Sequence, residues 1–195
     1  MPFIKPTSIL QRLLDLYPWL LLGGLQPGRD AQQLLATFWR EFKHDHPSHA
    51  VYRTENIKFE FTIPLLLHGD GARTLKKQPL EVVSLQPAIG LDSGKRLDLK
   101  CRCDSPKLYS GKDFSDPAAL RLNSKHNSYL THFLLFAFPS KKYKAMPGLL
   151  KAMLEATSVD MAMACCDGLV SGGQHYRFAV LGMKGDLEYH ARLGY

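Results

Sequence analysis

The chain has 195 residues, 45% of them hydrophobic, and its 25 lysines and arginines against 18 acidic residues give a net charge of +7. This length suits one domain with a real core and room for an appendage, and the basic balance favours polyanionic partners. The most apolar N-terminal stretch, residues 16–25, contains Pro18 and is well short of the roughly 20 residues that a bilayer requires, so we expect a soluble protein without a membrane partner.

The four cysteines do not have the spacing of a zinc site. Cys101 and Cys103 are separated by one residue, and Cys165 and Cys166 are adjacent, whereas zinc knuckles place two or more residues between their cysteines. The N-terminus lacks the early uninterrupted apolar core of a secretory signal. We therefore expect reduced thiols inside the cell and no metal site at these four positions.

Two helices are predicted near the N-terminus. The first covers residues 8–17, with Ser8 as a cap, and Pro18 ends or kinks it. The second begins at Asp30 and ends near residues 44–49, where three histidines and an aspartate suggest a metal site at first sight. Because consecutive loop residues rarely converge on one ion and Pro47 marks a turn, we favour a solvated loop there.

Strands are predicted next, beginning with residues 56–67 and 80–91. The short connection between them favours antiparallel pairing. Residues 92–128 are rich in Asp, Lys, Ser, Gly and Pro and are read as an irregular insertion, with a short strand near residues 97–102. A third strand covers residues 127–139.

A helix and a further strand follow. Pro147 suits the first position of a helix, and Gly168 suits the position after its end. Residues 178–186 then form an apolar run that closes on an aspartate, and a last helix begins there. Because a helix precedes this run, we expect the strand to lie parallel to the first one.

Two aspartates follow matching patterns at the ends of these two strands. Residues 63–74 read as an apolar run into Asp70, which is flanked by Gly69 and Gly71, and residues 178–186 read as an apolar run into Asp186. Carboxylates at the ends of neighbouring parallel strands can share a divalent cation, and Mg²⁺ prefers such oxygen ligands. The alternative for Asp70 is an ordinary turn residue, because Asp and Gly are common in turns.

The order of elements predicts an α/β protein with a partial RNase H-like fold. Three antiparallel strands, a helix, a parallel strand and a helix would occupy residues 51–195, preceded by a helical segment over residues 1–50. An unpaired sheet edge beyond Asp186 would allow self-association.

From about residue 63 onward, the chain resembles the catalytic core of eukaryotic DDE-type DNA transposases of the CACTA and Kyakuja-Dileera-Zisupton kind. The matching segments are residues 68–71 (HGDG) and 181–186 (LGMKGD). The chain also resembles uncharacterised repeated proteins of algal genomes, through residues 77–82 (KQPLEV) and 127–133 (NSYLTHF). This second likeness is the closer one and implies no activity.

The transposase resemblance implies a DNA strand-cleaving and strand-joining enzyme of the nucleus, with Asp70 and Asp186 as catalytic residues that hold Mg²⁺ or Mn²⁺. The third acidic residue of that family lies further downstream than this sequence extends, and Glu155 and Glu188 are stand-ins at best. We therefore expect a fragment or degenerate copy that is inactive alone. The alternative is a non-catalytic nucleic-acid-binding or protein-interaction module on the same fold.

Basic residues follow the first and third predicted strands. In the transposase reading these side chains contact the DNA backbone, while the alternative is a solvated charged surface. The residues concerned are Arg73, Lys76, Lys77, Lys141, Lys142 and Lys144.

Overall fold

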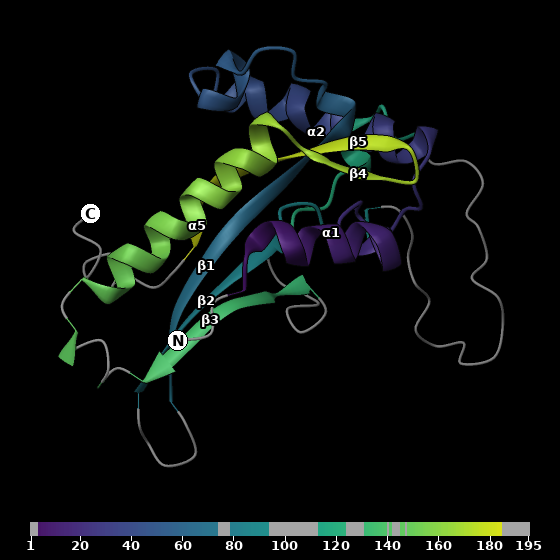
Figure 1. Ribbon diagram of the computed structural model, residues 1–195. Helices are drawn as coiled ribbons and strands as arrows, with labels where there is room; N and C mark the ends of the chain where they lie inside the picture. The colour runs from purple at the N-terminus through teal and green to yellow at the C-terminus, as the bar shows by residue number, and fades with distance from the viewer. Residues whose placement is uncertain are drawn as a thin grey trace, which may run out of the picture.

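A computed structural model describes residues 4–73, 79–93, 113–123, 131–139, 141, 145–146 and 148–184 of the chain (Figure 1). The described residues form an α/β protein, in which one five-stranded sheet is accompanied by three α-helices. The α-helices are α1 (Pro6–Leu16), α2 (Arg29–Asp45) and α5 (Leu149–Cys166). Short 3₁₀ helices are η1 (Pro18–Leu20), η2 (Ala50–Arg53), η3 (Phe59–Phe61) and η4 (Pro117–Ala119).

The sheet has the spatial order β3-β2-β1-β5-β4. Its strands are β1 (Thr62–Arg73), β2 (Pro79–Pro87), β3 (Phe133–Pro139), β4 (Leu169–Ser171) and β5 (Gln174–Lys184). β1, β2 and β3 form the predicted antiparallel meander, and β5 follows α5 and lies parallel to β1, as predicted. In Figure 1, α5 and β1 both run diagonally across the view, and α5 contacts β5.

The first strand begins later than its alternating sequence predicts. Residues 59–61 form η3 instead of extended chain, and β1 starts at Thr62, whose hydroxyl donates to the carbonyl of Lys58 at 2.8 Å. The Phe59 ring lies 5.6 Å from the ring of Trp39, between ring centres. Packing of this aromatic side chain against α2 therefore overrides the strand pattern of residues 57–61.

The strand that carries the second aspartate motif begins earlier than predicted, at Gln174, because β4 and β5 form a hairpin. Gly172 and Gly173 make its two-residue turn with φ of 58° and 75°, a conformation that glycine adopts without strain. The second strand ends at Pro87 instead of residue 91. Residues 97–102, 127–130 and 186–195, which were assigned to further elements or their extensions, lie outside the described residues.

One hydrophobic core joins the N-terminal helices to the sheet. Leu10 of α1 and Leu34 of α2 are buried in the same cluster as Ile63 and Leu65 of β1. Trp39 of α2 is 1% exposed, and its indole N–H donates to the carbonyl of Thr62 at 2.7 Å. This bond fixes α2 against the first residue of β1, and α2 also contacts η3, which immediately precedes this strand.

Candidate functional site at the ends of the parallel strands

The C-terminal ends of three strands lie at one end of the sheet. β2 is antiparallel to β1 and to β3, and β5 is parallel to β1, so β1, β3 and β5 all run in one direction. Arg73 of β1 lies opposite Pro79, and the next residue of β2, Leu80, lies opposite Pro139 of β3. The topology therefore brings both predicted basic segments to the same end of the sheet.

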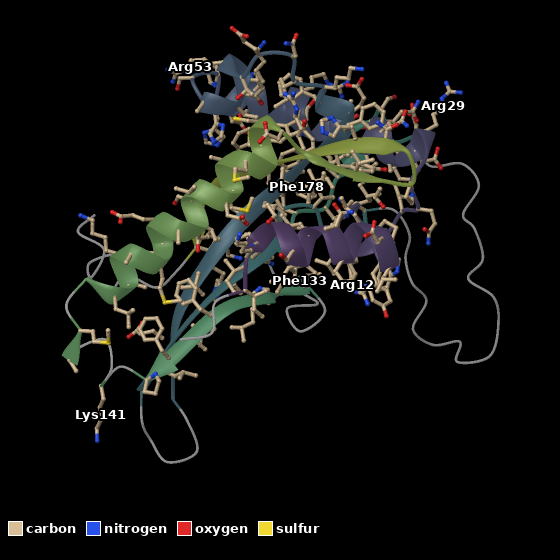
Figure 2. All side chains as sticks on the ribbon, viewed as in Figure 1. Arg12, Arg29, Arg53, Phe133, Lys141 and Phe178 are labelled. Atoms are coloured by element: carbon tan, nitrogen blue, oxygen red, sulfur yellow. The ribbon has the colours of Figure 1, made fainter. Side chains whose placement is uncertain are left out.

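Predicted site residues that the structure describes are found at this end. Asp70 and Arg73 belong to β1, where Asp70 lies opposite Val82 of β2. Lys141 is exposed and lies beyond the arrowhead of β3 in Figure 2. Lys76, Lys77, Lys142, Lys144 and Asp186 lie outside the described residues.

The register of the parallel pair places His68 of β1 opposite Lys184 of β5. An irregularity between Leu65 and Leu66 sets this register, because the partners of these two residues on β5 are residues 180 and 182. A shift of one residue would reverse which side chains of β5 share a face with those of β1. The bulge thus determines that Lys184 is beside His68.

A pair of histidines that sequence analysis did not identify meets further back along the sheet, level with the start of β3 and the described end of β5. The rings of His68 and His132 have their centres 4.9 Å apart and planes inclined by 47°. His68 lies on β1 and His132 immediately precedes β3, while β2 runs between these two strands. The two side chains must therefore reach toward each other over β2. Sixty-four positions separate them in the sequence, and no local pattern could have paired them.

Beneath these rings, β2 carries two buried polar side chains. Ser84 lies opposite His68 and is 4% exposed, and Gln86 is 3% exposed. The amide nitrogen of Gln86 donates to the carbonyl of Asn123 at 2.9 Å. Among the described residues, however, the Ser84 hydroxyl oxygen and Gln86 Oε1 have no hydrogen-bond partner. Such atoms are uncommon in native interiors, and each marks a place where a donor or a cation would be accommodated.

The environment of His132 favours its neutral form. Burial lowers the pKa of His132 below its ordinary value of 6.5, and the positive charges of His68 and Lys184 lower the pKa further. Desolvation and like charges both disfavour an imidazolium ion. The site therefore combines a neutral imidazole with a lysine ammonium group.

A cavity of about 650 Å³ lies beside the middle of β1 and the described end of β5. Phe38 and Phe42 of α2 form one part of its lining, and Leu66, Leu181 and Lys184 of the parallel strands form another. Its volume is within the range of small-molecule sites, and its apolar walls would suit a flat or aliphatic group. Lys184 belongs both to this cavity and to the surroundings of His132, so the cavity and the histidine pair are neighbours.

The histidines at the end of α2 each have a local partner. His44 forms an ion pair of 3.0 Å with Asp45, and both side chains are largely exposed. The ring of His46 lies 4.6 Å from that of Phe42, and His49 accepts a hydrogen bond from the backbone of Val51. Within the described part of the chain, no group of three or more His, Cys, Asp or Glu side chains is arranged to hold a metal ion.

Acidic side chains of α5 are engaged away from the strand ends. Glu155 is exposed and lies 3.9 Å from the ammonium group of Lys151. Asp160 is buried and accepts hydrogen bonds from the backbone nitrogen and hydroxyl of Thr7, at 2.7 and 3.0 Å.

One buried acidic residue does lie near Asp70. Glu81 of β2 is opposite Gly71, one position along β1 from Asp70.

The described cysteines and helices carry no further site. Cys165 is half-buried, which raises the pKa of its thiol, and Cys166 is exposed. Cys101 and Cys103 lie outside the described residues. No helix in the described ranges has the length and apolar character needed to cross a bilayer.

Comparisons with known proteins add no family assignment, since no family model, curated protein or solved structure matches the chain.

Proposed function

We propose that this chain is an RNase H-like module of the polynucleotidyl-transfer type, related to DDE transposases, in which Asp70 and Asp186 hold Mg²⁺ or Mn²⁺ at a DNA phosphate. Two carboxylates suffice to hold such an ion together with substrate oxygens. The ion would polarise the phosphate and activate water or a 3′-hydroxyl for in-line attack. Residues 51–195 would form this module and act in the nucleus.

The observation that carries the proposal is the parallel pairing of β1 with β5. His68 of β1 lies opposite Lys184 of β5. In the sequence, Asp70 comes two residues after His68, and Asp186 comes two residues after Lys184. Two acidic positions that are 116 residues apart in sequence would therefore lie side by side if β5 continued in this register. The strand order β3-β2-β1-β5 and the helix that precedes β5 also agree with the first four strands of an RNase H-like sheet.

Arg73 and Lys141 support DNA as the partner, because they lie at the same end of the sheet as Asp70. Together with Lys76, Lys77, Lys142 and Lys144, they would contact the phosphate backbone and position the duplex without reading its sequence. Each phosphate contact contributes about −0.9 to the slope of log affinity against log salt concentration. DNA binding should therefore be weak and should weaken steeply as salt is added.

A non-catalytic nucleic-acid-binding module is the second candidate. It is favoured because α5 offers no third carboxylate for the metal site. The first turn of α5 contains no acidic residue, Glu155 is exposed beside Lys151, and Asp160 is bonded to Thr7. Two carboxylates hold an ion loosely, whereas in-line displacement needs both the attacking and leaving oxygens to be clamped. We therefore expect this chain alone to bind metal and DNA without cleaving DNA.

Binding of Mn²⁺, measured by electron paramagnetic resonance of the free ion, tests the metal site directly. We expect one bound ion in the wild-type chain, and a large loss of affinity in Asp70→Asn and in Asp186→Asn. Asp15→Asn is the matched control, since Asp15 is an exposed aspartate on α1 that bonds to Gln11. Equal Mn²⁺ binding in all four proteins would refute the two-aspartate site.

A nicking assay on supercoiled plasmid then separates the two candidates. No nicking with Mg²⁺ or Mn²⁺ is expected from the wild-type chain, together with salt-sensitive binding to the plasmid. Metal-dependent nicking that disappears in both aspartate variants would show that the chain is a complete catalyst. Nicking that survives both substitutions, or an absence of DNA binding at low salt, would contradict the proposal.

A further inference from the structure

The histidine pair over β2 has the spacing of two imidazoles on one metal ion. With a metal–nitrogen distance of about 2.1 Å, an imidazole ring centre is about 3.2 Å from the metal, so two such rings at bond angles of roughly 90–110° have centres about 4.5–5.2 Å apart. The observed separation between the ring centres of His68 and His132 is 4.9 Å, which is within this interval. The two rings are inclined to each other and not stacked face to face.

The nitrogens of this pair are not committed to other groups. Within the described part of the chain, neither His68 nor His132 has a hydrogen-bond partner, whereas His49 and His175 each bond to the backbone. An imidazole nitrogen that makes no other bond is available as a metal ligand.

The strand beneath the pair offers oxygen atoms in need of a partner. Leu85 of β2 lies opposite Phe133 of β3 in an antiparallel register. One step along this register, Gln86 of β2 is level with His132, the residue before β3. Gln86 Oε1 is buried without a donor among the described residues, and so is the hydroxyl of Ser84 opposite His68. An amide oxygen is only an acceptor, and a bound cation would offset the cost of burying it.

We propose that His68 and His132 bind one transition-metal ion of the Zn²⁺ class above β2, with Gln86 Oε1 as an oxygen ligand. The site would be distinct from the proposed Asp70 and Asp186 site, and it does not depend on that site's function. Two nitrogen ligands select Zn²⁺, Co²⁺, Ni²⁺ or Cu²⁺ over Mg²⁺, which prefers oxygen. The ammonium group of Lys184 nearby reduces the affinity for a cation, so binding should be moderate and reversible.

Nuclear magnetic resonance of the imidazole nitrogens, with Zn²⁺ added to the wild-type chain, locates the ion without any substitution. We expect the resonances of His68 and His132 to change and those of His44, His46, His49 and His175 to stay. Changes confined to the histidines of residues 44–49, or an equal response to inorganic phosphate without metal, would overturn the proposal.

Zinc affinity measured by competition against a chromophoric chelator tests the ligands one at a time. His68→Gln and His132→Gln should each weaken Zn²⁺ binding at least tenfold, while His175→Gln and Asp70→Asn should leave it unchanged. Loss of Zn²⁺ binding in Asp70→Asn with none in His132→Gln would assign the ion to the aspartate site instead. With Co²⁺, a strong near-ultraviolet thiolate band would assign it to the cysteines and refute the histidine site. A thermal melt of each variant confirms that it is folded.

Discussion

Two groups of histidines in this protein differ in how their members are brought together. His44, His46 and His49 are close in the sequence, at the end of α2, but His44 pairs with Asp45, while His46 and His49 pack on the ring of Phe42. His68 and His132 are far apart in the sequence, yet their ring centres are 4.9 Å apart because β2 brings β1 and β3 together. Proximity in sequence thus predicts shared chemistry poorly, whereas sheet register can create it.

The surroundings of the two groups also differ in how well their polar atoms are satisfied. Around residues 44–49, the side chains pack on an aromatic cluster or face solvent, and Asp45 and His46 also line the cavity beside Lys184. Around His68 and His132, β2 contributes buried oxygens without partners in the described chain. Polar atoms left unsatisfied in a well-packed sheet are more typical of a binding site than of a stabilising core. The following predictions test this contrast.

The largest expected effect is at the aromatic cluster of the first group. Trp39→Ala should lower the free energy of unfolding by about 3–5 kcal/mol, the range for truncating a large buried aromatic side chain. Trp39 is 1% exposed, contacts the rings of Phe42 and Phe59, and donates to Thr62. Urea denaturation measures the loss. A loss below about 1 kcal/mol would show that this region is not the structural support that we describe.

A smaller effect of opposite sign is expected beneath the second group. Ser84→Ala, measured in the presence of a chelator, should raise the free energy of unfolding by about 1 kcal/mol, because it removes a buried hydroxyl that has no partner among the described residues. Thr37→Val is the matched control, since the Thr37 hydroxyl is also buried but donates to the carbonyl of Phe114 at 2.7 Å. That substitution should destabilise the protein. If both variants lose stability equally, the Ser84 hydroxyl is satisfied and the contrast fails.

The fold was largely predictable because the hydrophobic pattern and the turn residues act locally. The antiparallel meander, the helix before β5 and the parallel pairing of β5 with β1 all follow from short connections and one crossover. Where the prediction was wrong, tertiary packing decided the outcome, as when Phe59 packs on Trp39 instead of extending the first strand. The β4–β5 hairpin did have a local signal, Gly172 and Gly173, which was overlooked.

The candidate site was predictable only in part. The apolar run correctly predicted a strand before Asp70, but β1 continues past its predicted end at residue 67 through Asp70 to Arg73, because these residues pair with β2. The approach of His68 to His132 depends on the register of three strands, and the bulge at Leu65 and Leu66 decides which residue of β5 joins them. No local pattern encodes such a register, so Ser84, Gln86 and His132 were not recognised as site residues.

One histidine of each group, His44 and His132, should also titrate on opposite sides of the ordinary histidine pKa of 6.5. Burial first, and then the charges of His68 and Lys184, lower the pKa of His132, so the unfolded state binds more protons and the free energy of unfolding falls as pH drops through 6.5. The hydrogen bond and then the charge of Asp45 raise the pKa of His44, so its contribution is present below pH 6.5 and is lost as pH rises through the folded-state pKa. Imidazole proton shifts in metal-free protein report both midpoints, and midpoints on the same side of 6.5 would contradict this assignment.

The smallest effect is expected from His44→Gln, which removes the ion pair with Asp45. Both side chains are largely exposed, so water and salt screen their attraction and replace it at little cost when it is lost. The midpoint of urea denaturation at neutral pH should therefore not change measurably, and Asp45→Asn should behave alike. Zn²⁺ affinity should also be the same as in the wild-type chain, because His44 belongs to the group whose members do not converge. A loss of Zn²⁺ binding in His44→Gln but not in His132→Gln would reverse the roles of the two groups, since sequence neighbours would then form the metal site and the register-built pair would be structural.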